Sequence, residues 1–439
     1  MTTCPDLKRR RRRGSMEKYV ITGRRKLSGT IRMSGAKNAV LPMLASTVLA
    51  GEPCRIIDSP RLRDVQVMSD ILSQLGSVVR RYETDDGRKA LLVDTTSMAE
   101  YEVPEPLMRE MRSSIFLMGP LLGRFGKVRL SYPGGCAIGP RPIDLHLRGL
   151  RSLGAVIREM HGYILAEARD LKGSEIHLDF PSVGATENIM MAAVLATGST
   201  AIRNAAKEPE IIDMQNFLNG MGARIRGAGT DVIRIDGVKR LSGVDYHVIP
   251  DRIETGTFMI AAAMTGGEVC IENCIPEHVE SVTAKLREVG AEIKEEKDRI
   301  LVRGPSRPRA VDFKTLPYPG FPTDMQPQAM ALMCVADGIS VITETIFESR
   351  FNQAEELRRM GAGIKTEGRT AVVRGVETLF GATVEAYDLR GGASLTLAGL
   401  AAEGITTIEG VQHMDRGYDG LDRKLAALGA CIERIREDR

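Results

Sequence analysis

The chain repeats one pattern of hydrophobic and polar positions six times. Each copy contains a segment rich in Ala, Met and Leu that is apolar on nearly every side, and such a segment predicts a helix buried on all faces. A short turn with glycine and then a β-branched stretch follow, so a strand is expected next. The six segments are LPMLASTVLAGEPCRI, IFLMGPLLGRFGKVRL, IMMAAVLATGSTAI, FMIAAAMTGGEVCI, AMALMCVADGISVI and LTLAGLAAEGITTI.

A second signature, L-x-x-[LMV]-G-[AS], follows each apolar segment and predicts the end of an amphipathic helix. Its glycine fits the position just beyond a helix C-terminus. Because both signatures stay in phase, they indicate a true internal repeat. Each unit is predicted to contain a strand, a buried helix, a strand, an amphipathic helix and two more strands. The signature glycines are Gly76, Gly154, Gly222, Gly290, Gly361 and Gly429.

The repeat predicts an α/β protein of two similar domains with three units each. Each domain should pack three buried helices inside a ring of sheets and outer helices. We expect residues 37–249 to form domain II. Residues 16–36, a leftover strand pair, should join residues 250–439 in domain I, so that the chain crosses twice between the domains. Ligands commonly bind in the cleft between two domains.

Composition and charge exclude several functions. The formal net charge is +3, and the unbroken run of six cations Lys8–Arg13 leaves the rest mildly acidic. We interpret residues 1–15 as a disordered basic extension. Neither a secretory signal nor a run of ~20 apolar residues is present, so no membrane insertion is expected. Aromatic residues make up 4% and Trp is absent, which argues against a nucleic-acid surface.

The seven scattered cysteines predict a reduced, cytoplasmic protein. Cys270 and Cys274 are four residues apart, but only His278 lies near enough to complete a zinc site. Buried thiols are therefore the better interpretation, and neither a metal nor a cofactor is expected.

The segment PGGCAIGPRPIDLH (133–146) is too dense in Gly and Pro for a helix or an inner strand. It predicts a surface loop that presents Cys136 beside Arg141. Gly126 and Gly154 enclose this loop and are 28 residues apart, against 23 to 25 in the other units. The loop is thus expected to be an added lid that projects toward the other domain.

The motifs SGAKNAVLP, PGGCAIGPRPIDLH, SVGATENIMMAA, IPDRIETGTF, FPTDMQPQ, DLRGGASL and DRGYDG occur in the order and spacing of a known family. From Met16 onward the chain resembles the UDP-N-acetylglucosamine 1-carboxyvinyltransferases, which are enolpyruvyl transferases. The resemblance implies a two-domain inside-out α/β barrel. It also implies transfer of enolpyruvyl from phosphoenolpyruvate to the 3′-hydroxyl of UDP-N-acetylglucosamine, with release of phosphate, through a tetrahedral ketal. This reaction is the first committed step of peptidoglycan precursor synthesis.

The resemblance also assigns roles to residues. Cys136 would donate a proton to the methylene carbon, and Asp324 would accept the proton of the sugar hydroxyl. Lys37 and Arg416 would complete the catalytic set, and phosphoenolpyruvate would contact Lys37, Asn38, Arg141, Arg390 and Arg416. The sugar nucleotide would contact Arg112, Arg141, Pro142, Ile143, Asp144, Leu145, Ser182, Val183, Gly184, Asp324 and Ile346. His146, Asp64, Arg252, Glu254, Arg350 and Asp388 match positions near the family's cleft.

Two departures from the family pattern stand out. Phe180-Pro181 precedes SVGAT where some members carry a lysine, so the grip on the diphosphate is expected to differ. DLRGGAS has glycines where others have Ala-Ser, which would loosen the loop carrying Arg390. If SVGAT is only a strand-to-helix turn, Thr186 would cap the helix.

Two alternative functions remain open at this point. The sister transferase that acts on shikimate 3-phosphate shares the fold but lacks the PGGC loop, so Cys136 argues against it. A non-catalytic UDP-sugar sensor on the same scaffold would be favoured by loss of Asp324, Lys37 or Cys136, and all three are present.

Overall fold

The computed structural model describes residues 16–132, 134, 139 and 142–437. The basic extension 1–15, Cys136 and Arg141 lie outside the described residues, and so do the expectations that concern them. No described helix is both long and apolar enough to cross a membrane.

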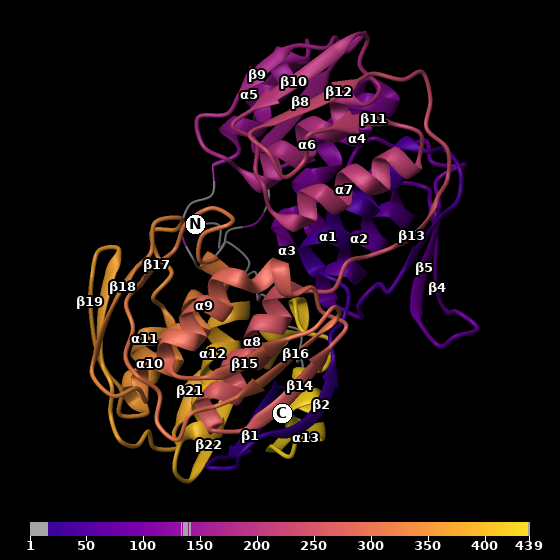
Figure 1. The fold of residues 1–439 in the computed structure, drawn as a ribbon. Helices are drawn as coiled ribbons and strands as arrows, with labels where there is room; N and C mark the ends of the chain where they lie inside the picture. The colour runs from indigo at the N-terminus through magenta and orange to yellow at the C-terminus, as the bar shows by residue number, and fades with distance from the viewer. Residues whose placement is uncertain (1–15, 133, 135–138, 140–141, 438–439) are drawn as a thin grey trace, which may run out of the picture.

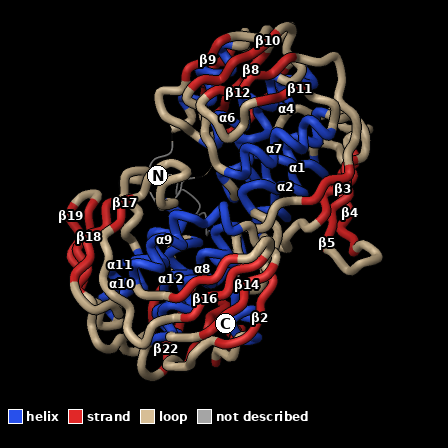
Figure 2. Tube along the Cα trace, viewed as in Figure 1, coloured by secondary structure: helices blue, strands red, loops and turns tan. Residues whose placement is uncertain are grey.

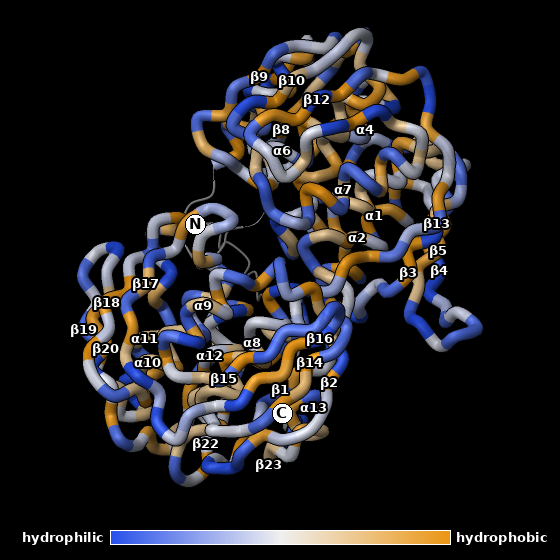
Figure 3. The backbone as a smooth tube through the Cα atoms, in the orientation of Figure 1, coloured by the Kyte–Doolittle hydropathy of each residue, from blue (hydrophilic) through white to orange (hydrophobic). Residues whose placement is uncertain are grey.

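The molecule has two lobes, each with its own hydrophobic core (Figure 1). Lobe II has core residues between Ala36 and Val248. Lobe I has core residues at Tyr19–Met33 and Ile253–Ile432. In both lobes helices lie inside and strands lie toward the outside (Figure 2). After Lys37 and Asn38 the helix α1 is mainly hydrophobic, whereas the turn at residues 84–88 is hydrophilic (Figure 3).

Lobe II contains the first three repeats. The first has α1 (Lys37–Ser46), β3 (Cys54–Ile57), α2 (Arg63–Gln74), β4 (Val78–Glu83) and β5 (Lys89–Asp94). The second has α3 (Glu105–Glu110), α4 (Met118–Phe125), β6 (Lys127–Ser131), α5 (Asp144–Ser152), β7 (Val156–Met160) and β8 (Tyr163–Glu167). The third has β9 (Glu175–His177), α6 (Val183–Ala193), β10 (Ser199–Arg203), α7 (Pro209–Gly220), β11 (Arg224–Arg226) and β12 (Val232–Asp236).

Lobe I contains the other three repeats and the N-terminal strands β1 (Met16–Thr22) and β2 (Ser28–Arg32). The fourth repeat has α8 (Arg252–Thr265), β14 (Glu268–Glu272), α9 (Glu280–Val289), β15 (Glu292–Glu295) and β16 (Arg299–Arg303), while β13 (Asp245–His247), which precedes α8 in the chain, pairs with β3 of lobe II. The fifth has β17 (Phe313–Lys314), α10 (Gln326–Cys334), β18 (Ile339–Thr343), α11 (Gln353–Arg359), β19 (Gly363–Glu367) and β20 (Thr370–Arg374). The sixth has β21 (Thr383–Glu385), α12 (Leu389–Ala401), β22 (Ile405–Glu409), α13 (Leu421–Ala427) and β23 (Cys431–Glu437).

The helix-end glycines and five of the six predicted buried helices are confirmed, whereas α4 of the second repeat is buried only from Met118 to Leu122. The interior helices α1, α6, α8, α10 and α12 are buried along almost their whole length. All six signature glycines have positive φ, between +92° and +103°, which is the left-handed conformation that closes a helix.

Five of the described sheets have four strands and one has three. Each four-stranded sheet contains one parallel and two antiparallel strand pairs. In the order β17-β18-β20-β19, for example, β17 and β18 are parallel and the other neighbours are antiparallel. The sixth repeat takes its inner strand, β1, from the N-terminus, because β1 pairs with both β22 and β23. The repeat prediction of a strand before every buried helix is wrong for the second unit. Among the described residues, only the isolated bridge Glu102–Arg129 stands in for that strand.

The two chain crossings between the lobes lie side by side. Ala36 donates its N–H to the carbonyl of Ile249 at 2.7 Å, and Asp251 donates to Ser34 at 2.9 Å. The strand before each helix stays in the lobe that the chain is leaving: β2, which precedes α1, pairs with β14 of lobe I, and β13, which precedes α8, pairs with β3 of lobe II. The crossing therefore fixes the starts of α1 and α8 next to each other.

Candidate active site at the junction of the lobes

One carboxylate caps the helices that begin at the crossing. Oδ2 of Asp251 accepts the backbone N–H of Lys37 at 3.0 Å, while its Oδ1 accepts those of Ile253 and Glu254 at 2.8 and 3.0 Å. Asp251 thus caps α8 of its own segment and α1 of the other lobe. Sequence reasoning did not single out Asp251, although an Asp directly before a helical pattern is the usual signal for a cap.

Asp64 brings together two of the predicted catalytic cations. Its Oδ2 lies 2.7 Å from Lys37 Nζ, and its Oδ1 lies 2.9 Å from Arg416 Nε. Burial raises the pKa of Asp64, but Lys37 and Arg416 outweigh burial and lower it. Burial also lowers the pKa of the Lys37 ammonium, against the opposing effect of Asp64. Because Asp64 and Arg416 belong to different lobes, this cluster joins them.

Asp324 is held by two arginines. Its Oδ1 accepts from Arg350 Nη2 at 2.7 Å, and its Oδ2 accepts from Arg390 Nη2 at 3.0 Å. Burial would raise the pKa of this carboxyl, but Arg390 and Arg350 hold it well below its usual value. Both arginine side chains are 3% exposed, whereas the Asp324 side chain is 26% exposed. Asp324 is thus a carboxylate anchored on its inner side and open on the other.

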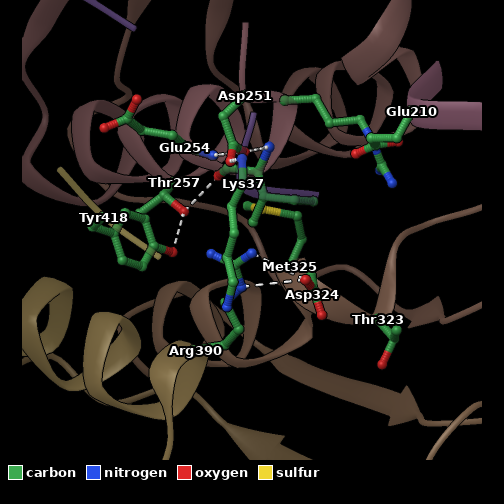
Figure 4. A network of polar contacts seen from close by, with 12 residues as sticks. Lys37, Glu210, Asp251, Glu254, Thr257, Thr323, Asp324, Met325, Arg390 and Tyr418 are labelled. Carbon is green, nitrogen blue, oxygen red and sulfur yellow. Dashed lines mark hydrogen bonds and ion pairs between the residues drawn. The ribbon is translucent and has the colours of Figure 1, made fainter. Parts of the chain in front are cut away.

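A buried polar network around Tyr418 holds Arg390 in place (Figure 4). Its guanidinium lies over the ring of Tyr418, 5.3 Å from the centroid. The Tyr418 hydroxyl is 3.0 Å from Thr257 Oγ1 and 3.1 Å from Gln328 Nε2. Asp388 caps the helix that carries Arg390 by accepting the N–H groups of residues 390 and 391. Arg390 is therefore held against Tyr418 while its guanidinium reaches Asp324.

The loop that contains Ile346 is tied to the turn of Asp324. Glu344 Oε1 accepts the backbone N–H of Ile346 at 2.8 Å, and its Oε2 accepts the hydroxyl of Thr323 at 2.9 Å. The structure therefore brings Ile346 and Asp324 together, as the resemblance requires. Glu344 was not singled out from the sequence, and nothing in its local pattern distinguishes it from a surface glutamate.

Two helix N-termini meet in lobe II. Asp144 begins α5, and Ser182 caps α6 by accepting the N–H of Ala185 at 3.3 Å. A Cβ on Gly184 would lie 3.1 Å from the ring of His146 on α5, so a larger residue here would need the two helices to shift slightly apart. Adjacent helix N-termini favour an anionic ligand. The expectation that Thr186 caps α6 is wrong, because Thr186 lies inside the helix and its hydroxyl instead accepts the N–H of Ala206.

His146 is a buried neutral imidazole beside this pair of N-termini. Burial, together with the nearby Arg112, lowers its pKa to about 4. Its Nδ1 lies 3.0 Å from Asn188 Nδ2. Arg112, which begins the 3₁₀ helix Arg112–Leu117, is thereby placed near the start of α5.

The other predicted site residues line the same regions. Asn38 is the second residue of α1 and is half-buried. Pro142 is exposed, Ile143 is buried, and Leu145, Val183 and Gly184 are half-buried. The lid residue Gly139 faces lobe I, since a Cβ there would lie 3.1 Å from Glu348 Oε2.

A further ion pair joins the lobes at the crossing. Arg252 Nε donates to Glu210 Oε1 at 3.0 Å, and both side chains are almost fully buried. Glu210 was missed because the sequence offers only the motif KEPEI, with no cue to which carboxylate faces the cleft. Within the part of the chain that the structure describes, no three His, Cys, Asp or Glu side chains are grouped so as to hold a metal ion.

This arrangement suits a small substrate with several negative charges. Lys37, Arg390 and Arg416 are close enough that the other two cations help to lower the pKa of Lys37. They are opposed by Asp64 and Asp324, which an incoming anion would replace as partners. The junction of the lobes thus combines cations, carboxylates and, in lobe II, a pair of helix N-termini.

Comparison with known proteins agrees with this chemistry. Residues 21–425 match the family described as EPSP synthase (3-phosphoshikimate 1-carboxyvinyltransferase), and the chain belongs to this family of enolpyruvyl transferases. Among its relatives, UDP-N-acetylglucosamine 1-carboxyvinyltransferase 1 of Symbiobacterium thermophilum is 61% identical over 95% of each chain. The protein of the same name from Caldanaerobacter subterraneus subsp. tengcongensis is 56% identical over 95% of this chain and 99% of its own.

Solved structures show the same fold. The enolpyruvyl transferase NikO from Streptomyces tendae superposes with a TM-score of 0.86 at 26% identity, over 97% of this chain and all of its own. An EPSP synthase from Acinetobacter baumannii gives a TM-score of 0.73 at 18% identity, over 96% of this chain and all of its own, and supports the fold alone.

Proposed function

We propose that the protein transfers enolpyruvyl from phosphoenolpyruvate to the 3′-hydroxyl of UDP-N-acetylglucosamine and releases phosphate. The observation that carries the proposal is the meeting of Lys37 and Arg416 on Asp64 beside Arg350 and Arg390 on Asp324. A trianionic substrate needs such a set of cations, and transfer to a hydroxyl needs a carboxylate at hand. The named relatives at 53–61% identity support this choice of acceptor.

In the first step the 3′-oxygen attacks C2 of phosphoenolpyruvate and loses its proton to Asp324. The methylene carbon C3 takes a proton, which we assign to the Cys136 thiol, and a tetrahedral ketal forms. In the second step the bond from C2 to the phosphate oxygen breaks, C3 returns a proton to the Cys136 thiolate, and the departing phosphate takes up the proton held by Asp324. Lys37, Asn38, Arg141, Arg390 and Arg416 would hold the anion throughout.

The sugar nucleotide is proposed to bind across the cleft from the paired helix N-termini to Asp324. The diphosphate would lie near Arg112, Arg141, residues 142–145 and residues 182–184. The sugar would reach Asp324 and Ile346, which the Glu344 contacts hold together. The exposed Phe180 stands where some relatives place a lysine, so backbone N–H groups would carry more of the diphosphate contact here.

The division into domains, the barrel architecture and the cellular location of the protein are also proposed. We propose that residues 37–249 form domain II, that residues 16–36 and 250–439 form domain I, and that the six repeats form an inside-out α/β barrel in each. The separate cores and the inner position of the helices support this division. The five described cysteines are free thiols, which favours a reducing, cytoplasmic location.

A phosphate-release assay tests the function. Purified protein should release phosphate from phosphoenolpyruvate only when UDP-N-acetylglucosamine is also present. Release with shikimate 3-phosphate in its place would favour the sister activity, and tight UDP-sugar binding without release would favour a sensor. The high identity to UDP-N-acetylglucosamine enzymes makes the first outcome the expected one.

Selective alkylation tests the assignment of Cys136. A phosphonate epoxide that mimics phosphoenolpyruvate should modify Cys136 alone, and faster when the sugar nucleotide is present. Burial raises the pKa of Cys54 to about 11 and of Cys274 and Cys334 to about 12, so these thiols should stay unmodified. Peptide mass spectrometry reads the result, and equal labelling of the partly exposed Cys270 or Cys431 would contradict it.

A further inference from the structure

The turn that carries Arg416 is attached to both lobes. Arg416 reaches Asp64 of lobe II, as described above. Tyr418 points the other way, into the lobe I network with Thr257. Asp419 turns back to lobe II, where its Oδ2 accepts the backbone N–H of Arg61 at 2.9 Å and Lys89 Nζ at 2.6 Å. Three side chains from four consecutive residues therefore alternate between the lobes.

The Asp419 contact is buried and has well-defined partners in lobe II. The Asp419 side chain is 3% exposed, and Lys89, at the start of β5, reaches it from a position that is 41% exposed. Burial raises the pKa of Asp419, but Lys89 and the Arg61 N–H outweigh burial and lower it. Asp419 is therefore a buried carboxylate whose close partners come from the opposite lobe. Arg423, on its own lobe, stands 3.9 Å away.

The two contacts to lobe II differ in what substrate binding does to them. Under the proposed function, on which this inference rests, Arg416 must exchange Asp64 for the anion of phosphoenolpyruvate. The Asp419 contact involves no group that touches the substrate, so it can persist during that exchange. We propose that Asp419 and Lys89 are positioning residues that hold the Arg416 turn against lobe II while Arg416 changes partner.

Lys89→Met is expected to weaken the capture of phosphoenolpyruvate. Without the contact between Lys89 and Asp419, the turn can move away from lobe II when Arg416 leaves Asp64. Binding of phosphoenolpyruvate should therefore become weaker. The KM for phosphoenolpyruvate should rise about three- to tenfold, as expected for loss of one partly exposed, charge-assisted contact. The kcat should stay within about twofold, and the KM for UDP-N-acetylglucosamine should not change. Lys89→Arg should restore most of the loss.

A matched control separates positioning from general stability. Arg129 on β6 is 44% exposed and pairs with Glu102 within lobe II. Arg129→Met removes a cation of similar exposure whose ion pair does not join the lobes, so its KM values should equal those of the unmodified protein. Melting temperatures of both variants report any general loss of stability.

Three outcomes would overturn the proposal. These are an unchanged KM for phosphoenolpyruvate in Lys89→Met, an equal rise in Arg129→Met, and a lower melting temperature with no kinetic change. If the unmodified protein fails to release phosphate, the proposed function fails instead. Calorimetric titration of phosphoenolpyruvate into the unmodified and Lys89→Met proteins then decides the positioning role by itself, since equal affinities would refute it.

Discussion

Asp324→Asn is expected to lower the kcat for phosphate release about 10²- to 10⁴-fold, the range for loss of a general base. The amide cannot accept the proton of the sugar hydroxyl, yet it keeps the shape and one acceptor oxygen of the carboxylate. Asp324 is buried on its inner side against Arg350 and Arg390. The substrates should therefore still bind, so KM should change far less than kcat.

The control is Asp298→Asn, which changes an exposed carboxyl on the turn before β16. It should leave both constants unchanged. A fall in kcat of less than about tenfold in Asp324→Asn would remove Asp324 from the role of base. Binding of UDP-N-acetylglucosamine by calorimetry shows whether the variant retains an intact cleft.

The pH dependence follows from the direction of the pKa shift. The folded-state pKa of Asp324 lies well below its usual value because of Arg390 and Arg350, against the effect of burial. Its stabilising contribution is thus fully present above the unfolded pKa of ~3.9 and is lost as the pH falls through the lower folded value. Between pH 5 and 8 the free enzyme should keep Asp324 ionised, so an acidic limb of kcat/KM in that range belongs to another group.

A carboxylate with a strongly lowered pKa is a weak base, and this has a consequence for the reaction. If phosphoenolpyruvate draws Arg390 toward its own anion, Asp324 keeps only Arg350 as a close cationic partner. The pKa of Asp324 should then rise and its basicity should increase. Binding of one substrate would thereby prepare the base that activates the other.

The repeats show how much of the fold the sequence could predict. Gly76 and Gly429 lie at opposite ends of the chain, yet both have the positive φ that the signature predicts. Local patterns of this kind can be recognised directly from the order of the residues. The repeat count led to the expectation that residues 16–36 join the C-terminal half, but the pairing of β2 with β14 and of β13 with β3 could not be predicted, because strand pairing across about two hundred residues leaves no local signal.

The site residues show the same difference between local sequence patterns and contacts that depend on the fold. The motifs led to Lys37, Asp324 and Arg390, and the structure places the charged groups of all three close together. The residues that hold them were less visible. Asp251 accepts the backbone N–H of Lys37, and Glu344 accepts the hydroxyl of Thr323, and both partners are distant from the carboxylate in sequence. Contacts of this type depend on tertiary position, so their residue type alone cannot identify them.

Lys37→Met is expected to lower kcat/KM about 10²- to 10³-fold, the usual loss when a preorganised charge at a developing anion is removed. Lys37 is 8% exposed, and its ammonium lies 2.7 Å from Asp64 Oδ2. The methionine fills a similar volume but leaves Asp64 with Arg416 as its remaining close cation. Removing one partner of a buried pair is costly, so the melting temperature should also fall.

The double variant Lys37→Met/Asp64→Asn separates these two effects. Neutralising Asp64 removes the uncompensated buried charge, so the melting temperature should recover toward that of the unmodified protein. The activity should not recover, because the cation that contacts phosphoenolpyruvate is still absent. Lys294→Met, which removes a 72% exposed ammonium on β15, serves as the control and should change neither quantity. If the double variant regained turnover, Lys37 would be a structural partner of Asp64 and Arg416 would have to hold the anion without it.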